Sequence, residues 1–440
     1  MHGPTCIFWA NLTPFSLKAG AHPHTDCSNS WLPFLRRFLK ADDDGIHRLT
    51  AGPIHLTPFV CDAPDCPPNN GSLSNRSHFQ IRDVSIDYCR GDGYYYLTGT
   101  TSAISPELDS GVIRMWRSQT LQPGSFRGGG VVWNTTRDCH DNELCGNISV
   151  HGSCLLPGTG FIWAPEYHYL PNKAADVPGS GGNFLTYEMH CGGGTTGLMK
   201  STSGHALGPY EILLPQWAGG DPSLFQDPAD NATYAIGAGG GGINAVRLTE
   251  NMSAFEGGLA SRFGFGNNTD MHSHGNPLGR VTDNASLPQY NISKFIGFEG
   301  PFLTFWRGSY YLSAASFGNA TVHGGPGPQS AYGRDGNYNA YAGKADSIRG
   351  NFTTATQPPW LMVPMGGHNT LFRDKAGALW STIWYGSSNH VPPSDKPYVQ
   401  VPSIVRMGVV DGKLVALLKT DDHSHTQHGV DRKRTECADY

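Results

Sequence analysis

A strand, a turn containing Gly, Asp or Asn, and a second strand rich in aromatic residues recur five times along this chain. The five units are "FQIRDVSIDYCRGDGYYYLTGTTS" from Phe79, "FIWAPEYHYLPNK" with "NFLTYEMH" from Phe161, "GGDPSLFQDPADNATYAIGAGG" from Gly219, "FEGPFLTFWRGSYYLSAAS" from Phe298 and "GGHNTLFRDKAGALWSTIWYG" from Gly366. Successive units begin about 60 to 80 residues apart. Sheets repeated in this way avoid open edges by closing into a ring of four-stranded blades. The pattern therefore predicts an all-β protein, a five-bladed β-propeller.

The repeats also divide the chain. We expect an irregular N-terminal extension containing Cys and Pro over residues 1–78, the propeller over 79–420, and a flexible tail over 421–440. A β-sandwich with repeated hairpins is the alternative architecture. The propeller is favoured because the opening strand of each unit carries a polar residue at a comparable position.

The composition agrees with a β protein and excludes two classes of partner. Gly (57) and Pro (31) are abundant and charged residues make up only 15%, which is typical of a turn-rich β chain. The net charge is −5 and no basic stripe is present, which argues against nucleic-acid binding. No apolar run approaches the roughly 20 residues needed to cross a bilayer. Nothing in the sequence sets the oligomeric state.

Glycosylation sequons and cysteines indicate an extracellular protein. Sequons recur at Asn11, Asn70, Asn75, Asn134, Asn147, Asn231, Asn251, Asn267, Asn284, Asn291, Asn319 and Asn351. The ten cysteines show no paired C-x-x-C spacing, so disulfide bonds are favoured over a zinc site. The N-terminus lacks the basic and apolar regions of a signal peptide. We nevertheless predict a secreted, disulfide-containing glycoprotein.

Each opening strand contributes one polar residue: Asp83 in "RDVS", Glu166 in "WAPE", Asp221 in "GDPS", Glu299 in "FEGP" and His368 in "GGHN". The innermost strands of a propeller line one channel, so these side chains are expected to converge at one mouth. Converging carboxylates push their pKa values apart.

Glu299 is predicted to be the carboxyl group that keeps its proton, because Phe298 and Gly300-Pro301 give it an apolar setting. Asp83 and Asp221 have more polar neighbours and are predicted to stay ionised. The alternative for Glu299 is a surface side chain in a turn. One protonated and one ionised carboxyl group are what glycosidic-bond cleavage requires.

Three tryptophans, Trp163, Trp306 and Trp384, could offer flat faces to sugar rings. Core packing is the alternative reading for each of them.

The series "RDVSI", "WAPEYHY", "GDPSLF", "FEGPFLTFWRGSYYL" and "GGHNTLF" resembles glycoside hydrolase family 43, the five-bladed propellers of arabinanases, arabinofuranosidases and β-xylosidases. The resemblance covers Phe79 to Leu418. It implies an inverting hydrolase of arabinan, xylan or galactan that requires no cofactor. Asp-Val-Ser stands where the family usually has Asp-Pro-Ser, and the Cys-bearing N-terminal segment is atypical.

The resemblance also implies a role for each matched residue. Asp83 resembles the general base, Glu299 the general acid, and Asp221 the third carboxylate, which orients the acid and raises its pKa. Trp163 resembles an aromatic side chain that lines the sugar site. His368 resembles a channel histidine that in some members lies beside a structural calcium ion, often through water.

The sequence also bears on two other functions. The retaining invertase and levansucrase type uses Asn-Asp-Pro-Asn-like and Glu-Cys motifs, and this chain has neither. A carbohydrate-binding or structural glycoprotein, with the same propeller but without catalysis, is the alternative function.

Overall fold

The computed structural model describes sixteen segments of the chain, all of which belong to one compact unit, Thr50–Tyr440. They are residues 54–56, 62–64, 81–101, 111–138, 161–190, 195–215, 217, 219–239, 242–258, 263–264, 299–317, 338–350, 352, 360–363, 367–385 and 401–417. Within these segments the structure is almost entirely β, apart from a four-residue helix α3 (Thr135–Asp138) and a 3-10 turn (Pro171–Lys173). None of the helices in the described part of the chain is long and apolar enough to cross a membrane.

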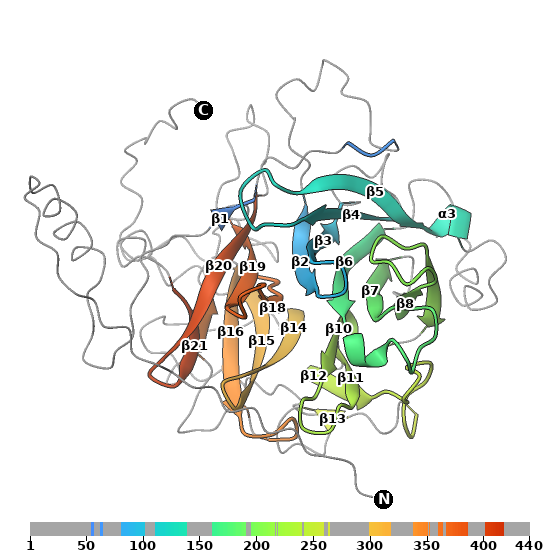
Figure 1. The fold of residues 1–440 in the computed structure, drawn as a ribbon. Helices are drawn as coiled ribbons and strands as arrows, with labels where there is room; N and C mark the ends of the chain where they lie inside the picture. The colour runs from blue at the N-terminus through green and yellow to red at the C-terminus, as the bar shows by residue number, and fades with distance from the viewer. Residues whose placement is uncertain are drawn as a thin grey trace, which may run out of the picture. The chain divides into compact units, whose positions relative to one another are not determined.

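Five antiparallel sheets form the blades of a propeller, which confirms the predicted fold (Figure 1). The first blade contains β2 (Arg82–Cys89), β3 (Tyr94–Thr100), β4 (Val112–Ser118) and β5 (Arg127–Asn134). The second contains β6 (Phe161–Tyr169), β7 (Asn183–His190), β8 (Thr195–Ser201) and β9 (Tyr210–Leu214). The third contains β10 (Gly220–Gln226), β11 (Thr233–Gly239), β12 (Gly242–Arg247) and β13 (Phe263–Gly264). The fourth contains β14 (Glu299–Trp306), β15 (Ser309–Phe317), β16 (Tyr338–Ala345) and β17 (Trp360–Val363).

The fifth blade joins the two ends of the ring. It contains β18 (Leu371–Arg373), β19 (Leu379–Tyr385), β20 (Val401–Val410) and β21 (Lys413–Ala416), together with β1 (Ile54–His55). β1 pairs with β20 through Ile54 and Ile404, so a strand from before the first blade completes the last one. This segment lies inside the predicted N-terminal extension.

Two tight hairpins show how the local sequence sets the strand connections. Arg307 and Gly308 join β14 to β15, and Asp411 and Gly412 join β20 to β21. All four residues have positive φ angles, between 49° and 82°. A two-residue turn with both residues left-handed matches the twist of the strands that it connects. Glycine at the second position adopts the positive φ angle without steric strain.

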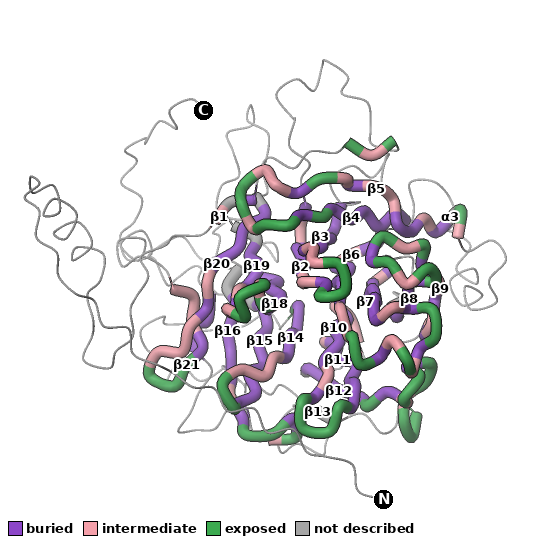
Figure 2. The backbone as a smooth tube through the Cα atoms, viewed as in Figure 1, coloured by how far each residue is buried: buried purple, intermediate pink, exposed green. Residues whose placement is uncertain are grey.

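The core is divided among the five junctions between neighbouring blades, and each junction is filled by one cluster of buried side chains. Between the first and second blades, for example, Trp133 of β5 and Tyr187 of β7 belong to one cluster and are fully buried. Figure 2 shows buried backbone along the strands and exposed backbone in the connecting turns. Because each cluster draws on two blades, apolar burial stabilises the ring of blades as well as the individual sheets.

The predicted extracellular features fall mostly outside the described residues. Cys89 is the one cysteine inside them, and it is a buried free thiol. Asn231 and Asn251 are exposed sequon asparagines, and Asn134 is half-buried. The remaining nine cysteines and nine sequons, the C-terminal tail and most of the N-terminal extension lie outside the described segments.

Candidate active site

The innermost strands of the five blades begin with the same backbone irregularity. One residue in each blade has a left-handed conformation: Asp83, Ala164, Asp221, Gly300 and His368, with φ between 41° and 54°. In the first four blades a β-bulge lies at this point. A non-glycine residue held in this region costs about 1–3 kcal/mol and is typical of functional sites. The five positions are structurally equivalent, so they mark one end of the channel.

This register corrects the predicted equivalence of the polar residues. Asp83, Asp221 and His368 do occupy equivalent positions, as expected. Glu299 lies one residue before the left-handed Gly300, and Glu166 lies two residues after its blade's left-handed position. A sequence signal for the true register was available, because proline follows the left-handed residue in Ala-Pro, Asp-Pro and Gly-Pro of blades two to four.

Asp83 is held by a hydroxyl group and lies beside His368. Thr100 donates a hydrogen bond from Oγ1 to Asp83 Oδ2 at 2.7 Å. Asp83 Oδ1 lies 3.7 Å from His368 Nδ1, and both side chains are almost fully buried. The Thr100 hydroxyl also accepts a 2.7 Å bond from the Ala164 N–H, which ties the first blade to the second. The Asp83 carboxylate is therefore fixed in orientation at the channel mouth.

His368 is surrounded by acidic groups. Its burial lowers the pKa, but Asp83, followed by Asp221, Glu166 and Glu299, outweighs burial, so the pKa of His368 is raised overall. Its Nε2 atom is buried and has no hydrogen-bond partner within the described residues. A histidine cation is thus favoured at the centre of the carboxylate group.

Asp221 links two neighbouring parts of the site. Its Oδ2 accepts a 2.8 Å bond from the Gly300 N–H, and its own N–H donates a 2.6 Å bond to Glu188 Oε2. Burial raises the pKa of Asp221 to about 7; Glu188 and Glu299 add to the increase, while His368 and the Gly300 N–H oppose it.

The predicted distribution of protons is corrected by this environment. Glu299 was expected to be the carboxyl group in apolar surroundings, and Asp221 was expected to stay ionised. In the structure Glu299 is exposed at the start of β14. Asp221 is the carboxyl group whose pKa is raised by burial. The reason is the bulge, because it places the side chain of the left-handed residue in the channel and leaves the preceding residue at the rim.

The electrostatics show which predicted residues come together. Glu299 lies close enough to raise the pKa of both Asp221 and His368, and Asp83 contacts His368 directly. Asp83, Asp221, Glu299 and His368 therefore share one mouth of the channel, with Glu166 deeper along it.

Trp163 belongs to the same mouth, while Trp306 does not. Trp163 is half-buried, and it pairs with Glu188 of β7 as Glu299 pairs with Ala315 of β15, so Trp163 and Glu299 hold equivalent positions in their blades. Trp306 lies at the opposite end of β14 and stacks with Arg373 at 5.0 Å, which makes it unsuitable for this site. The Trp384 side chain lies outside the described residues.

Glu188 and Thr100 were not predicted, because both lie on the second strand of their blade and not on the opening strand. Each faces the start of the inner strand in its own blade, Thr100 across from Arg82 and Glu188 across from Trp163. The signal for Glu188 was a single carboxylate in the strand "NFLTYEMH", directly after Tyr187.

The expected calcium ion can be compared with the donor groups present. The described residues contain no group of three His, Cys, Asp or Glu side chains arranged to hold a metal ion. Calcium prefers oxygen ligands, so the His368 ring fits only a contact through water.

No protein-family model and no curated protein sequence matches this chain. Solved structures do match it. The Cellvibrio cellulosa α-L-arabinanase complexed with arabinohexaose superposes with a TM-score of 0.50 at 13% identity, over 80% of this chain and 98% of that one. An exo-1,5-α-L-arabinanase from a bovine ruminal metagenomic library gives 0.49 at 15% identity, over 77% and 96% of the two chains. A xylan β-1,4-xylosidase from Bacillus halodurans C-125 gives 0.47 at 19%, over 80% and 56%.

The superposition on the Cellvibrio arabinanase, at 13% identity, bears on the fold and leaves the activity open. Together with the five blades, it confirms the architecture that the resemblance predicted, and the chain has the five-bladed β-propeller fold of glycoside hydrolase family 43.

Proposed function

We propose that this protein is a secreted inverting glycoside hydrolase of the family 43 type that acts on arabinan, xylan or galactan chains. The observation that carries the proposal is the gathering of Asp83, Asp221 and Glu299 with His368 at one mouth of the channel, although they come from four different blades. Inversion needs two carboxyl groups with different proton occupancy facing one glycosidic bond.

Asp83 is proposed as the general base. Its Oδ2 accepts a hydrogen bond from Thr100, and its Oδ1 faces the His368 ring, so the carboxyl group is held in one orientation. An ionised, oriented carboxylate can take a proton from the attacking water. His368 then positions the base, and it does not itself exchange a proton with the substrate.

Glu299 is proposed as the general acid. It is exposed at the rim, where a glycosidic oxygen can reach it. Asp221 fixes the backbone directly after Glu299 through the Gly300 N–H. When Asp221 is ionised, its charge disfavours a second negative charge nearby and so helps Glu299 to keep its proton. Trp163, at the equivalent position of the second blade, is proposed to stack against the sugar.

The acid role is tested with Glu299→Gln. The variant is expected to lose at least about a hundredfold in kcat on arabino- or xylo-oligosaccharides, the lower range of general acid catalysis. Activity on an aryl glycoside with a good leaving group should fall much less, because that leaving group needs little protonation. Glu211→Gln, at an exposed carboxylate paired with Lys200, is the matched control and should leave both activities unchanged.

The stereochemistry is tested by NMR of the first product anomer. Release of the anomer opposite to that of the substrate supports the inverting assignment. Retention of configuration would contradict it. Tight oligosaccharide binding with no turnover by the unmodified protein would favour the carbohydrate-binding alternative.

Secretion is a separate part of the proposal. Asn231 and Asn251 are exposed, as a glycan acceptor must be. When the protein is expressed in a glycosylating eukaryotic host, its mass should fall after enzymatic removal of N-glycans. The decrease in mass should be smaller for the double variant Asn231→Gln/Asn251→Gln. An unglycosylated product at both positions would count against secretion.

A further inference from the structure

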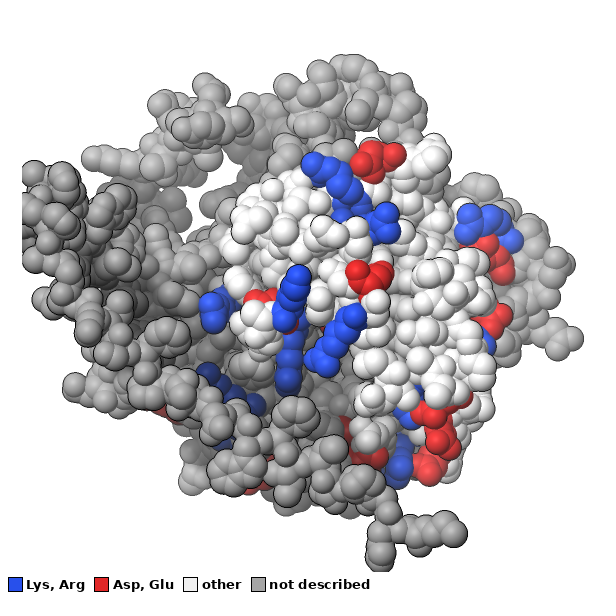
Figure 3. Space-filling view, viewed as in Figure 1, with Lys and Arg blue, Asp and Glu red and all other residues white. Residues whose placement is uncertain are grey.

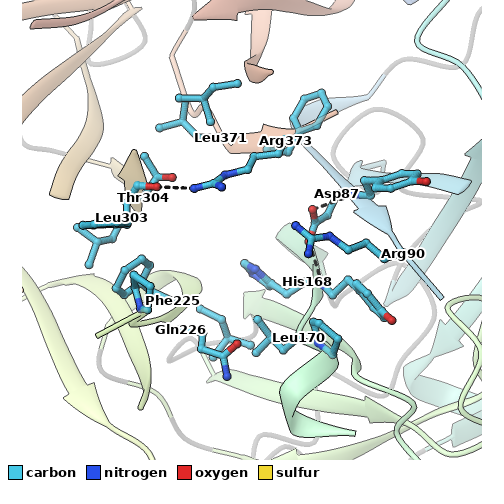
Figure 4. Close-up of a pocket in the computed structure, with 18 of the residues that line it drawn as sticks. Asp87, Arg90, His168, Leu170, Phe225, Gln226, Leu303, Thr304, Leu371 and Arg373 are labelled. Atoms are coloured by element: carbon cyan, nitrogen blue, oxygen red, sulfur yellow. Dashed lines mark hydrogen bonds between the residues drawn. The ribbon is translucent and has the colours of Figure 1, made fainter. Parts of the chain in front are cut away.

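A cavity of about 570 Å³ lies at the end of the channel opposite the carboxylates (Figure 4). Its lining comes from the later parts of all five inner strands and the turns that follow them, for example Asp87 of β2, Gln226 of β10 and Phe305 of β14. None of Asp83, Asp221, Glu299 and His368 is among the residues that line it. The cavity is therefore separate from the proposed active site.

Positively charged side chains converge on this cavity. Arg90 follows β2, Arg373 ends β18, and Lys375 lies in the turn after β18. Figure 4 shows the Arg90 and Arg373 side chains extending toward the middle of the cavity, with Asp87 beside Arg90. Figure 3 shows Lys and Arg side chains gathered around the hollow at the centre of this face. Partial burial, together with the charge of Arg90, lowers the pKa of Arg373.

The two acidic side chains that line the cavity are already engaged by the protein. Asp87 accepts bonds from the Tyr88 N–H at 2.8 Å and the Tyr169 N–H at 2.9 Å, one on each oxygen. Asp374 accepts bonds from two backbone N–H groups and, at 2.8 Å, from Trp380 Nε1. Both carboxylates therefore serve as structural acceptors for turns and strand ends.

Arg373, by contrast, keeps most of its donors. Arg373 uses one N–H, which donates to the Phe305 carbonyl at 2.7 Å, while its guanidinium stacks on Trp306. Arg90 lies near Asp87, and its charge opposes the rise that burial causes in the pKa of that carboxyl group. A guanidinium carries five N–H donors in a planar fork that matches a carboxylate. The cavity thus presents donors that are oriented but not yet used.

Among the apolar residues that line the cavity, Leu170 and Phe305 are half-buried, whereas Leu224, Phe225, Leu303 and Leu379 are buried. A bare inorganic anion would occupy only a small part of 570 Å³, since a water molecule accounts for about 30 Å³. The shape and lining favour a ligand with an apolar body and one anionic group.

We propose that this cavity binds a small organic carboxylate, whose anionic group is held by Arg90 and Arg373 and whose apolar body lies against Leu170 and Phe305. Lys375 adds a third positive charge at the rim. The site is independent of the hydrolase proposal, because it shares no residue with the carboxylate group.

The test is isothermal titration calorimetry of the full-length protein with phenylacetate, at constant ionic strength. Phenylacetamide has the same shape without the charge. It is expected to bind at least about tenfold more weakly, because one hydrogen bond to a charged group contributes about that factor or more to affinity. Inorganic phosphate is expected to bind more weakly than phenylacetate. Equal binding of phenylacetamide or of inorganic phosphate, or no binding of phenylacetate, would overturn the proposal.

Arg90→Met and Arg373→Met each remove the charge and keep an apolar stem. Each is expected to weaken phenylacetate binding about tenfold, and the salt dependence of binding should fall with them. Arg373 also supports Phe305 and Trp306, so Arg90→Met is the cleaner variant for the fold. Arg117→Met, on an exposed side chain that lies over Tyr94 and does not line the cavity, is the matched control.

Glu299→Gln separates this proposal from the hydrolase proposal. It should bind phenylacetate as the unmodified protein does, while Arg90→Met should retain any hydrolysis that is measured. Unchanged phenylacetate affinity in folded Arg90→Met, confirmed by its circular dichroism spectrum and thermal transition, would contradict the arginine assignment.

Discussion

The Gly300 N–H donates a 2.8 Å hydrogen bond to Oδ2 of Asp221, and this bond joins the third blade to the fourth beside the proposed acid. Asp221 lies buried at this junction, and burial raises its pKa to about 7. The Asp221 side chain therefore stabilises the junction as a hydrogen-bond acceptor, but its ionised form is destabilised by burial. The two effects can be separated by substitution.

Asp221→Asn keeps an acceptor for Gly300 and removes the ionisation. In the unfolded chain an Asp titrates near 3.9. Between that pH and about 7 the folded wild type binds a proton that the unfolded chain does not, so its free energy of unfolding falls as the pH rises through this window. The variant lacks this loss and should gain stability relative to wild type, by up to about 4 kcal/mol at pH 8.

Urea unfolding of both proteins from pH 4 to pH 8 measures this difference. Asp411→Asn is the matched control, because Asn-Gly suits the same exposed hairpin turn, and its difference from wild type should stay small. A gap between Asp221→Asn and wild type that is constant with pH would contradict the raised pKa.

Glu188→Gln tests the carboxylate behind Asp221. Gln keeps an oxygen that accepts the Asp221 N–H but removes a negative charge that raises the pKa of Asp221. The Asp221 titration should therefore move to lower pH. Carboxyl ¹³C NMR of Asp-labelled protein, assigned with Asp221→Asn, measures this shift without relying on activity. An unmoved titration would show that Glu188 acts only as a hydrogen-bond acceptor.

Gly300→Ala should be more damaging than an ordinary change at a left-handed glycine. Gly300 has φ +54°, and a Cβ there would lie 2.9 Å from the His368 ring. Gly308 has φ +82° in the same blade, with nothing within 4 Å of the added Cβ. Gly308→Ala should cost about 1–2 kcal/mol of backbone strain. Gly300→Ala should cost about 1–3 kcal/mol more, for overpacking.

Denaturant unfolding gives both values, and the His368 ring reports the local effect. Its NMR titration should change in Gly300→Ala and stay unchanged in Gly308→Ala. Equal losses of stability in the two variants would mean that the fourth blade yields and that His368 is not held by this contact.

The sequence was sufficient to predict the fold, because the fold depends on repetition. Five similar hairpins require a closed ring, and a closed ring brings Asp83, Asp221 and His368 together wherever they fall in the chain. The position of Glu299 relative to them depends on a one-residue bulge, which shifts a side chain from channel to rim. A pattern of period two does not reveal such a shift.

Partners from other strands were harder to predict than positions within one strand. Glu188 reaches Asp221 from a different blade, and the strand β1 closes the ring from a segment that has no repeat of its own. The strand β1 has only two residues, too few to show the alternation of apolar and polar residues by which a strand is recognised in a sequence. Their role follows only from the free edge of β20, which a closed ring must cover.

Leu56 tests that closure. It follows β1, is fully buried among side chains of the first and fifth blades, and its N–H donates a 3.0 Å bond to the Pro402 carbonyl. Leu56→Ala should therefore destabilise the whole propeller by about 2–5 kcal/mol, as for other buried leucines. Leu207→Ala, at a leucine that is 38% exposed, is the matched control and should cost no more than about 0.5 kcal/mol. Denaturant unfolding measures both. If Leu56→Ala matched the control, the ring would close without this segment, and β1 would be an accessory to the fifth blade.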